Sequence, residues 1–431
     1  MKNKQIILIS VIGIFVIGIF AGTFFLKKEK ENTATNTTSS TTQSQETKQE
    51  ESVAKIETTA LENATNVDLS KNATLSITQA GVYNITGKTS EGQITVNLAN
   101  DTDEVTLVLN NAEIANSTTS PISILNGKNV TIETKTGTTN TITGTGSDTE
   151  NTATIYSKDD LDFSGDGELV VTSANNNAIQ SKNDLTFTSG TYQLTAKNEA
   201  IKGKDSVTFD GGVFNLTSES HGVKTTNTEE ANKGVITVNG GELNIKASED
   251  GLHATTNVVI NKGVVTLDVE DDGIHADGEL IVNNGTINVK NSYEGLEASN
   301  VQIKGGEIEV NAQDDGINGA GGNDTATTQD HFSNSTGEIT ISGGKIVIKA
   351  GLSGSGDGVD SNGDLTISAG EVKVYDPENA RDWSAIDFDG NYTQNESASV
   401  TEISSSGTET AITEATAGQG GKGMGGGMGR R

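Results

Sequence analysis

The sequence has no cysteine in its 431 residues, so the fold can use neither disulfides nor a thiolate metal site. The same absence removes the lipid-linked cysteine of a bacterial lipoprotein. Proline is nearly missing, with 2 residues, and aromatic residues make up only 4% of the chain. The protein must therefore hold together by aliphatic packing and hydrogen bonds.

Positive charge is also scarce. The chain has 29 Lys and Arg residues against 59 Asp and Glu residues, which gives a formal net charge of −30. Such a charge repels nucleic-acid phosphates and anionic membrane surfaces, so we expect no nucleic-acid partner. Cations and neutral or cation-bridged ligands remain as candidates.

The abundant residues are those of strands and tight turns. Glycine occurs 51 times, and Thr, Asn, Val and Ile supply most of the remainder. β-Branched residues favour strands, while Gly and Asn favour turns. This composition predicts an all-β protein.

The N-terminus, residues 1–28, reads as an export segment. Ile6–Leu26 is an apolar run that would span about 31 Å as a helix, and Lys2 precedes it. Its length favours a signal anchor, but Ala21 and Gly22 leave a cleaved signal peptide open. Either alternative predicts an extracellular or cell-surface protein, membrane-anchored or secreted.

Polar and Gly-rich segments flank one large central region. Residues 29–66 contain almost no large apolar side chain, which predicts a disordered polar stalk. Residues 393–431 predict a polar and Gly-rich tail. The remaining residues, 67–392, are expected to form a single domain, and we expect a monomer.

This central region repeats itself every 22 residues. The repeated unit contains a small residue followed by an aliphatic one, and two short strands with alternating apolar residues. The recurring pairs are Ala178-Ile179, Ala200-Ile201, Gly222-Val223, Gly251-Leu252, Gly273-Ile274, Gly295-Leu296, Gly316-Ile317 and Gly358-Val359. Units this short bury a core only by stacking. We therefore predict a right-handed, single-stranded parallel β-helix, a solenoid of about 22 residues per coil.

Stacking predicts continuous columns of identical positions. The inward apolar columns should include Leu185, Phe187, Val207, Phe209, Val258, Ile260, Leu280 and Val282. Outward, acidic residues recur beside the small residue, and in three repeats they are doubled. Like charges about 4.8 Å apart repel by about 0.9 kcal/mol in water and by about 3.5 kcal/mol at an effective dielectric of 20.

Calcium relieves such repulsion, because it accepts six to eight oxygen ligands, including carboxylates from adjacent coils. The predicted calcium ligands are Glu249, Asp250, Asp271, Asp272, Glu294, Asp314, Asp315, Asp357 and Asp360. Ordinary turn chemistry is the alternative, since Asp before Gly often bonds to nearby backbone amides. His253 and His275, in consecutive repeats, also leave a zinc site open, although exposed hydrogen-bonding histidines are the simpler interpretation.

Several ordered motifs resemble secreted bacterial carbohydrate-binding domain-containing proteins with a pectate-lyase-like parallel β-helix. The motifs are Ala80–Gly87, Gly137–Gly144, Ile155–Leu161, the repeated Asp-Gly-aliphatic turns and Ala385–Gly390. The resemblance implies binding of plant-type or acidic polysaccharide with bound calcium. After Gly390 the chain departs from the family pattern, which leaves the cap of the solenoid undetermined.

We expect an extracellular, calcium-dependent polysaccharide-binding protein. The candidate carbohydrate-binding residues are Trp383, His253, His275, Glu297 and Asp387. One alternative is a polysaccharide lyase acting on uronate polymers, for which Lys202 and Lys224 are candidate bases if burial lowers their pKa. The other is a structural or adhesive surface spacer.

Overall fold

The structure is a computed structural model that describes residues 61–417, except for residue 101 and the segments 147–152, 321–336 and 379–382. The predicted export segment, most of the stalk and the end of the tail lie outside the described residues. In the part that is described, every regular element is a strand. This part contains no helix that is long and apolar enough to cross a membrane.

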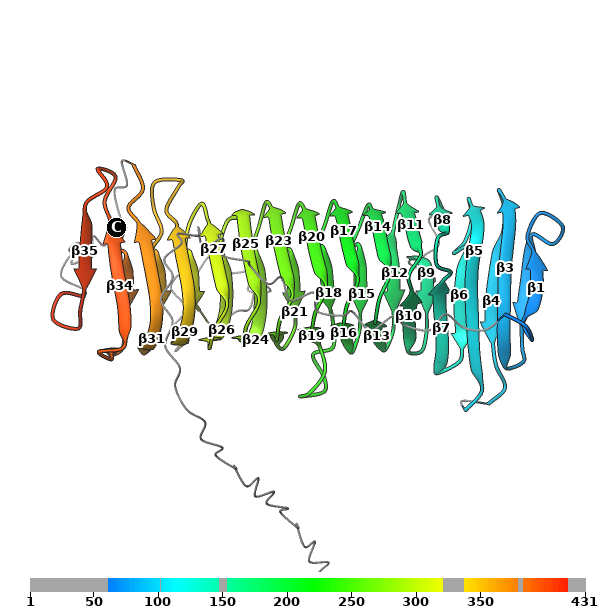
Figure 1. The fold of residues 1–431 in the computed structure, drawn as a ribbon, viewed down its shortest axis with the longest axis horizontal. Coiled ribbons are helices and arrows are strands. Elements are labelled where there is room, and N and C mark those ends of the chain that lie inside the picture. The colour runs from blue at the N-terminus through cyan, green and yellow to red at the C-terminus, as the bar shows by residue number, and fades with distance from the viewer. Residues whose placement is uncertain (1–60, 101, 147–152, 321–336, 379–382, 418–431) are drawn as a thin grey trace, which may run out of the picture. The chain divides into compact units, whose positions relative to one another are not determined.

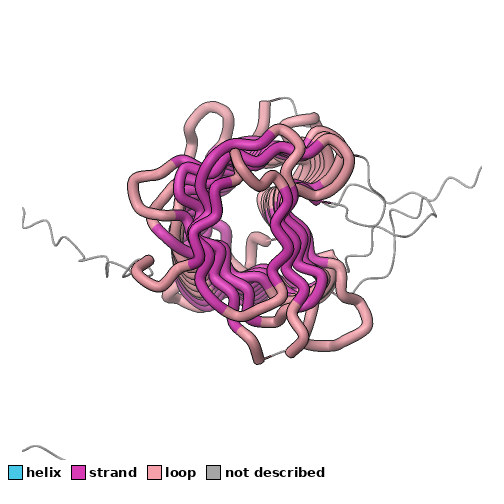
Figure 2. The backbone as a smooth tube through the Cα atoms, turned by 90° about the vertical axis from the view of Figure 1, so that its right-hand side faces the viewer, coloured by secondary structure: helices cyan, strands magenta, loops and turns pink. Residues whose placement is uncertain are grey.

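The strands stack into a parallel β-helix, as predicted (Figures 1 and 2). Its strands form three columns, which we name A, B and C in the order in which each coil meets them. Column A contains β2 (Thr74–Ile77), β4 (Gln93–Asn97), β6 (Ile122–Asn126), β9 (Ala153–Ser157), β12 (Asn177–Ser181), β15 (Ile201–Gly203), β18 (Val223–Thr225), β21 (Leu252–Ala254), the starts of β24 (Ile274–Val282) and β26 (Leu296–Ile303), β28 (Ile317–Gly319), β30 (Val359–Ser361) and β32 (Ile386–Phe388).

Columns B and C complete each coil. Column B contains β1 (Thr65–Asp68), β3 (Gly81–Thr89), β5 (Glu104–Asn116), β7 (Asn129–Thr134), β10 (Leu161–Gly165), β13 (Asp184–Phe187), β16 (Ser206–Phe209), β19 (Val235–Val238), β22 (Val258–Ile260), the ends of β24 and β26, the starts of β29 (Glu338–Lys349) and β31 (Leu365–Tyr375), and β33 (Tyr392–Gln394). Column C contains the ends of β3 and β5, β8 (Thr139–Gly144), β11 (Glu168–Ser173), β14 (Thr191–Ala196), β17 (Val213–Ser218), β20 (Glu242–Ala247), β23 (Val264–Val269), β25 (Thr286–Asn291), β27 (Glu307–Asn311), the ends of β29 and β31, and β34 (Ala398–Ile403).

The register between neighbouring coils follows the sequence repeat. Leu185 lies opposite Val207 in the next coil, and Val258 lies opposite Leu280. The insertion at residues 225–234 leaves this register intact, because Val207 continues to Ile236. Every strand pair is parallel except β34 with β35 (Glu409–Ile412).

The core is a stack of aliphatic and aromatic side chains inside the coils. All eight inward positions predicted from the repeat are fully buried. Phe187 stacks between Phe163 and Phe209, with ring centroids 4.8 and 5.4 Å apart. Stacked aromatic pairs of this kind add about 0.5–1.5 kcal/mol each beyond area burial.

Both ends of the solenoid extend beyond the limits that the sequence suggested. At the N-terminal end, β1 already begins at Thr65. At the C-terminal end, β34 and β35 form an antiparallel hairpin past residue 392, in which Val400 and Ile412 are buried. The antiparallel strand β35 thus covers the edge of β34, the last strand of column C. Because polar residues separate these apolar ones, the sequence did not predict these short strands.

Candidate functional site

Two rows of side chains run along the N-terminal ends of the column A strands. The turn row lies directly before the small residue of each repeat and comprises Asn177, Glu199, His221, Asp250, Asp272, Glu294, Asp315 and Asp357. The strand row follows the aliphatic residue and comprises Gln180, Lys202, Lys224, His253, His275, Glu297, Asn318, Asp360 and Asp387. Within one coil, each turn-row residue lies three positions before a strand-row residue and beside it, so the two rows face each other.

Turn-row side chains hold the backbone of the next coil. The Asp272 peptide N–H donates to Asp250 Oδ1 at 2.9 Å, and that of Glu294 donates to Asp272 Oδ1 at 3.2 Å. The Asp357 peptide N–H likewise donates to Asp315 Oδ1 at 2.6 Å. These acids therefore have the backbone-bonding role expected of turn residues, and their second carboxylate oxygens remain for other partners.

The histidines of the two rows form a continuous stack. The ring centroids of His221 and His253 are 4.6 Å apart, and those of His253 and His275 are 4.9 Å apart. The expectation that these histidines lie on an exposed edge is wrong. His253 is buried and the His275 side chain has no exposed surface.

His275 is enclosed by carboxylates. Its Nδ1 lies 2.7 Å from Glu297 Oε2 and 3.3 Å from Asp272 Oδ2, and its Nε2 lies 3.2 Å from Asp277 Oδ1. Burial disfavours the imidazolium, but these acids outweigh burial and raise the pKa of His275. His275 therefore holds the acids together, and its buried ring offers no surface to a sugar.

His221, Asp250 and His253 form a second buried group, which we call the His221 cluster. Asp250 Oδ2 lies 2.6 Å from His253 Nδ1 and 3.3 Å from His221 Nδ1. Burial opposes the charge of Asp250, but the two histidines outweigh burial and hold its pKa below the ordinary value. Burial lowers the pKa of His253, which favours a neutral imidazole.

Carboxylates replace histidines farther along the rows. Asp315, Asp357 and Asp360, the Asp315 cluster, each place a carboxylate oxygen within 4.8 Å of the others. Burial, with the neighbouring carboxylates, raises the pKa of Asp315 to about 8 and that of Asp360 to about 6. Burial and neighbouring acids also raise the pKa of Glu294.

A buried amide adjoins this cluster. Asn318 lies opposite Asp360 in register and donates from Nδ2 to Glu294 Oε2 at 2.8 Å. Its Oδ1 is buried and accepts no hydrogen bond within the described residues. An unsatisfied buried acceptor costs free energy, so this oxygen is suited to a cation.

The remaining predicted calcium ligands lie beside these groups. Asp250, Asp271 and Asp272 form another set of carboxylates within 4.8 Å of one another. Glu249 is half-exposed and contacts His221 Nε2 at 2.9 Å. Asp314 hydrogen-bonds the hydroxyl of exposed Tyr293 and raises its pKa to about 12. The structure thus brings the predicted acids together as several local groups.

The predicted sugar contacts differ in accessibility. Asp387 is exposed at the end of the strand row. Trp383 is partly buried against the core, and its indole N–H is buried without a hydrogen-bond partner in the part of the chain described. Tyr293 exposes 47% of its surface beside the acids, which makes it the better stacking platform.

The candidate bases lie at the other end of the same rows. Lys202 Nζ pairs with Glu199 Oε1 at 2.9 Å. Lys224 Nζ lies 2.5 Å from His221 Nε2, and burial lowers the pKa of Lys224. The lyase interpretation required a lysine with a lowered pKa, and Lys224 meets that condition.

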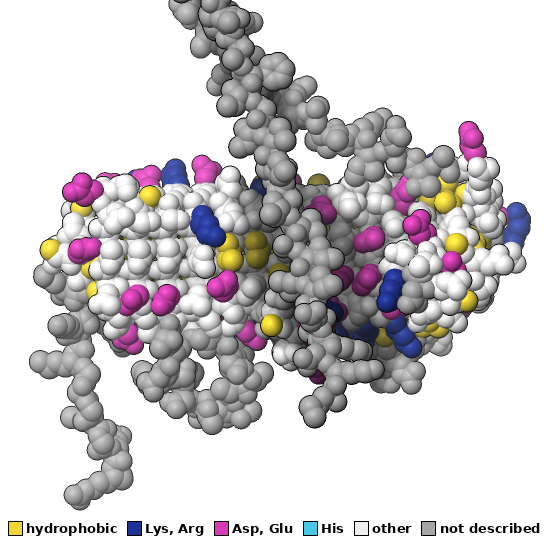
Figure 3. Space-filling model, turned by 90° about the horizontal axis from the view of Figure 1, so that it is seen from below, with side chains coloured by type: hydrophobic (Ala, Val, Ile, Leu, Met, Phe, Trp, Pro, Cys, Tyr) yellow, Lys and Arg dark blue, Asp and Glu magenta, His cyan; other side chains and the backbone are white. Residues whose placement is uncertain are grey.

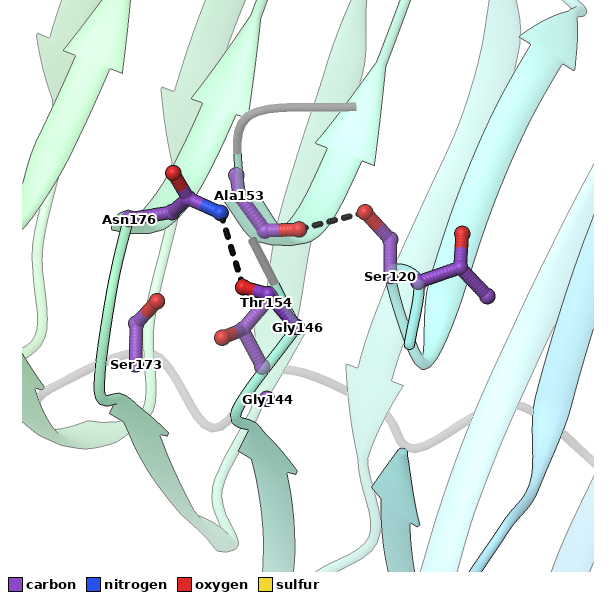
Figure 4. Close-up of a pocket in the computed structure, with 8 residues that line it drawn as sticks. Ser120, Gly144, Gly146, Ala153, Thr154, Ser173 and Asn176 are labelled. Carbon is purple, nitrogen blue, oxygen red and sulfur yellow. Dashed lines mark hydrogen bonds between the residues drawn. The ribbon is translucent and has the colours of Figure 1, made fainter. Parts of the chain in front are cut away.

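Other surfaces carry less chemistry. On the face in Figure 3, acidic side chains are scattered and hydrophobic ones form only small patches. A small pocket between coils is lined by Thr119, Ser120, Gly144, Gly146, Ala153, Thr154, Ser173 and Asn176. There Ser120 donates to the Ala153 carbonyl and Asn176 to the Gly146 carbonyl (Figure 4). Its lining has no carboxylate, imidazole or amine.

Sequence reasoning missed three members of these groups. The repeat places His221 in the same column as Asp250, but the sequence carries no signal that its ring contacts Asp250 and His253. Asp277 lies outside both rows, and the sequence carries no signal for its contact with His275. Asn318 belongs to the strand row, but its unsatisfied oxygen depends on side-chain geometry.

Comparisons with known proteins agree with this picture. A family model described as carbohydrate-binding domain-containing protein matches residues 71–316 and 266–420. A carbohydrate-binding domain-containing protein of Acetivibrio thermocellus is 36% identical over 143 residues, which are 31% of this chain and 50% of that protein. The chain thus spans about half the length of this curated relative.

A solved structure gives a further likeness. It is described as the polysaccharide lyase-like protein from C. thermocellum, gadolinium derivative, and is 34% identical. The match covers 48% of this chain and 87% of that chain, with a TM-score of 0.47. The family model covers most of the chain and includes every residue of both rows, so this chain belongs to the carbohydrate-binding domain-containing family.

Proposed function

We propose that this chain is an extracellular, calcium-dependent polysaccharide-binding protein whose ligand is an acidic or plant-type polysaccharide. The observation that carries the proposal is the Asp315 cluster. Three carboxylates from adjacent coils meet there, and burial with mutual repulsion raises the pKa of two of them. Family membership supports the carbohydrate partner.

The donor set fits calcium. Carboxylate and amide oxygens are the ligands that calcium prefers, and Asn318 Oδ1 adds a buried oxygen without a partner among the described residues. Asp315, Asp357 and Asp360 would hold the ion, with Glu294 and Asn318 beside them. A bound calcium would neutralise the repulsion between these acids.

A bound calcium ion would also reduce the repulsion between the acidic protein and an acidic ligand. A uronate polymer meets net repulsion from a protein of charge −30, so its affinity is weak without a bridging cation. A divalent ion held by the acidic rows reverses the local field and can accept uronate oxygens. Tyr293, exposed beside Asp314, offers a ring face for the sugar.

Retention on immobilised polygalacturonate tests this proposal. The exported part of the chain should be retained in calcium and released by excess chelator. A variant with Asp315, Asp357 and Asp360 all replaced by Asn should lose calcium-dependent retention, while circular dichroism shows a folded solenoid. Tyr293→Ala should weaken retention without abolishing its calcium dependence.

The matched control replaces three exposed acids away from the rows, Glu104, Glu242 and Glu307, by Gln. This control also reduces the negative charge by three but should retain calcium dependence. If the cluster variant binds in chelator as well as the parent does, calcium bridging is wrong. A neutral-sugar surface would then become the better interpretation.

The lyase alternative has one observation in its favour, the lowered pKa of Lys224. Cleavage by β-elimination needs a base that removes the proton α to the uronate carboxylate while the glycosidic C–O bond breaks. Neutral Lys224 could accept that proton. The same polygalacturonate samples should therefore be assayed for unsaturated products, and their formation, lost in Lys224→Gln, would establish an enzyme.

A further inference from the structure

We propose that His221, Asp250 and His253 bind a divalent transition-metal ion such as zinc, at a site separate from the calcium cluster proposed above. The three residues come from two adjacent coils, and all are buried. Each offers one ligand atom, and these atoms lie within 4.8 Å of one another. The inference depends on this group alone and does not rest on the proposed carbohydrate function.

The donor atoms distinguish this site from the calcium cluster. Two imidazole nitrogens and one carboxylate oxygen suit zinc, cobalt or nickel, whereas calcium takes oxygen ligands. Three protein ligands with a position left for water are also the arrangement of zinc sites that bind small molecules. The same two rows thus offer nitrogen donors at one place and oxygen donors at another.

The distances require only small movements. Ligand atoms around a tetrahedral zinc ion, each about 2.0–2.2 Å from the metal, lie about 3.4 Å apart. His221 Nδ1 and Asp250 Oδ2 are already 3.3 Å apart. His253 Nδ1 and Asp250 Oδ2, at 2.6 Å, must separate by less than about 1 Å to reach that spacing.

Glu249 occupies the place of an orienting partner. Its Oε2 lies 2.9 Å from His221 Nε2, the ring nitrogen on the far side from Asp250. Metal-bound histidines commonly donate their second N–H to a carboxylate, which fixes the ring and its tautomer. The Asp250 peptide N–H donates to His221 Nδ1 at 3.2 Å, so this nitrogen is unprotonated, and a metal ion at Nδ1 would replace that hydrogen bond.

Two neighbours limit the site. His275 continues the ring stack, but its nitrogens are engaged by Asp272, Asp277 and Glu297, so it is not a ligand. Lys224 Nζ lies 2.5 Å from His221 Nε2, and its ammonium would repel an added dication. Lys224 therefore opposes metal binding and provides a matched control.

Calorimetric titration of zinc into the metal-free protein, in excess calcium, tests the site. We expect one zinc ion to bind, and His221→Gln and His253→Gln should each weaken binding more than tenfold. Even the loss of a residue that only hydrogen-bonds to a metal ligand lowers metal affinity about 10–100-fold. Lys224→Gln should bind zinc as tightly as the parent or more tightly. Melting curves of each variant report whether it is folded.

Cobalt provides a readout that needs no variant. Cobalt bound to the parent protein through imidazole should give visible d–d absorption. This absorption should disappear when zinc displaces the cobalt and should persist when calcium is added. The proposal is overturned if the parent binds neither metal in excess calcium, or if both histidine variants bind zinc normally. If Lys224→Gln lost as much zinc affinity as the histidine variants, the assignment of the ligands would be overturned. None of these readouts uses polysaccharide, so the proposed function can fail independently.

Discussion

At the residue scale, the two rows show how a repeated acid is accommodated at successive positions. Burial opposes the charge of Asp250, but the two histidines beside it outweigh burial and hold its pKa below the ordinary value. Among the described residues, Asp315 has no ion pair with a cationic side chain, and burial with nearby acids favours its protonated form. Asp250 and Asp315 therefore have opposite pKa shifts, although they occupy equivalent positions in the repeat. Burial and the nearby carboxylates of Glu297 and Asp250 also raise the pKa of Asp272, although it lies beside His275.

This difference predicts an unusual pH dependence for the metal-free protein. The folded state binds the Asp315 proton more tightly than the unfolded chain does, because the pKa rises from 3.8 to about 8. This contribution to stability is fully present below the unfolded value and is lost as pH rises toward about 8. Melting temperatures in metal-free buffer should fall through this window. Asp315→Asn should flatten the fall, and an unchanged slope in that variant would contradict the assignment.

His275 provides a second prediction at this scale. Its raised pKa means that its stabilising contribution is present below the ordinary value of 6.5 and persists until pH exceeds the raised value, so it is intact at neutral pH. His275→Gln removes the buried imidazole that contacts Asp272, Asp277 and Glu297, and breaking such a buried pair should cost about 3–5 kcal/mol. Urea unfolding measures this loss. As a control, Glu242→Gln at an exposed position should change stability little. Equal stability of the two variants would contradict this role of His275.

At the element scale, the small residue before each aliphatic one is required by close approach between coils. A Cβ on Gly295 would lie 2.3 Å from the Gly316 carbonyl oxygen and 2.3 Å from Val310. Ala178 and Ala200 occupy the same position in earlier coils, so a methyl group is tolerated there. The repeat revealed this position as small, but only the packing of the next coil shows which members must be glycine.

Gly295→Ala should therefore destabilise the solenoid, by about 1–3 kcal/mol as expected for overpacking. The converse change in the same column, Ala200→Gly, should cost only about 0.5–1 kcal/mol through backbone entropy. Denaturant unfolding of both variants compares the two costs directly. A Gly295→Ala protein at least as stable as the parent would show that the coils can separate at this point.

Much of this architecture could be predicted from the sequence, because the repeat fixes the register. The core positions Phe187 and Leu280 and the alignment of His253 with His275 follow from counting residues. The burial of the histidines did not follow, since polar residues at a turn suggest an exposed edge. The hairpin of β34 and β35 was missed because a cap lies outside the repeat.

At the scale of the whole solenoid, the rows change chemistry in one direction along the chain. The strand row begins with Gln180 and two lysines, continues through two histidines, and ends in carboxylates at Asp360 and Asp387. A repeat holds the backbone constant while the side chains vary, so one surface can contain several sites with different preferred ligands. The net charge of −30 makes cations the expected ligands at the acidic end.

The last prediction is that calcium stabilises the whole solenoid through this acidic end. A ligand that binds only the folded state adds about 2.7 kcal/mol to the free energy of unfolding at a concentration 100 times its Kd. Calcium should raise the melting temperature of the parent and chelator should reverse the rise. Because each coil packs only on its neighbours, the Asn variant of Asp315, Asp357 and Asp360 should lose most of this response yet keep its zinc response at His221 and His253. An identical melting curve in calcium and in chelator would show that calcium does not stabilise the fold.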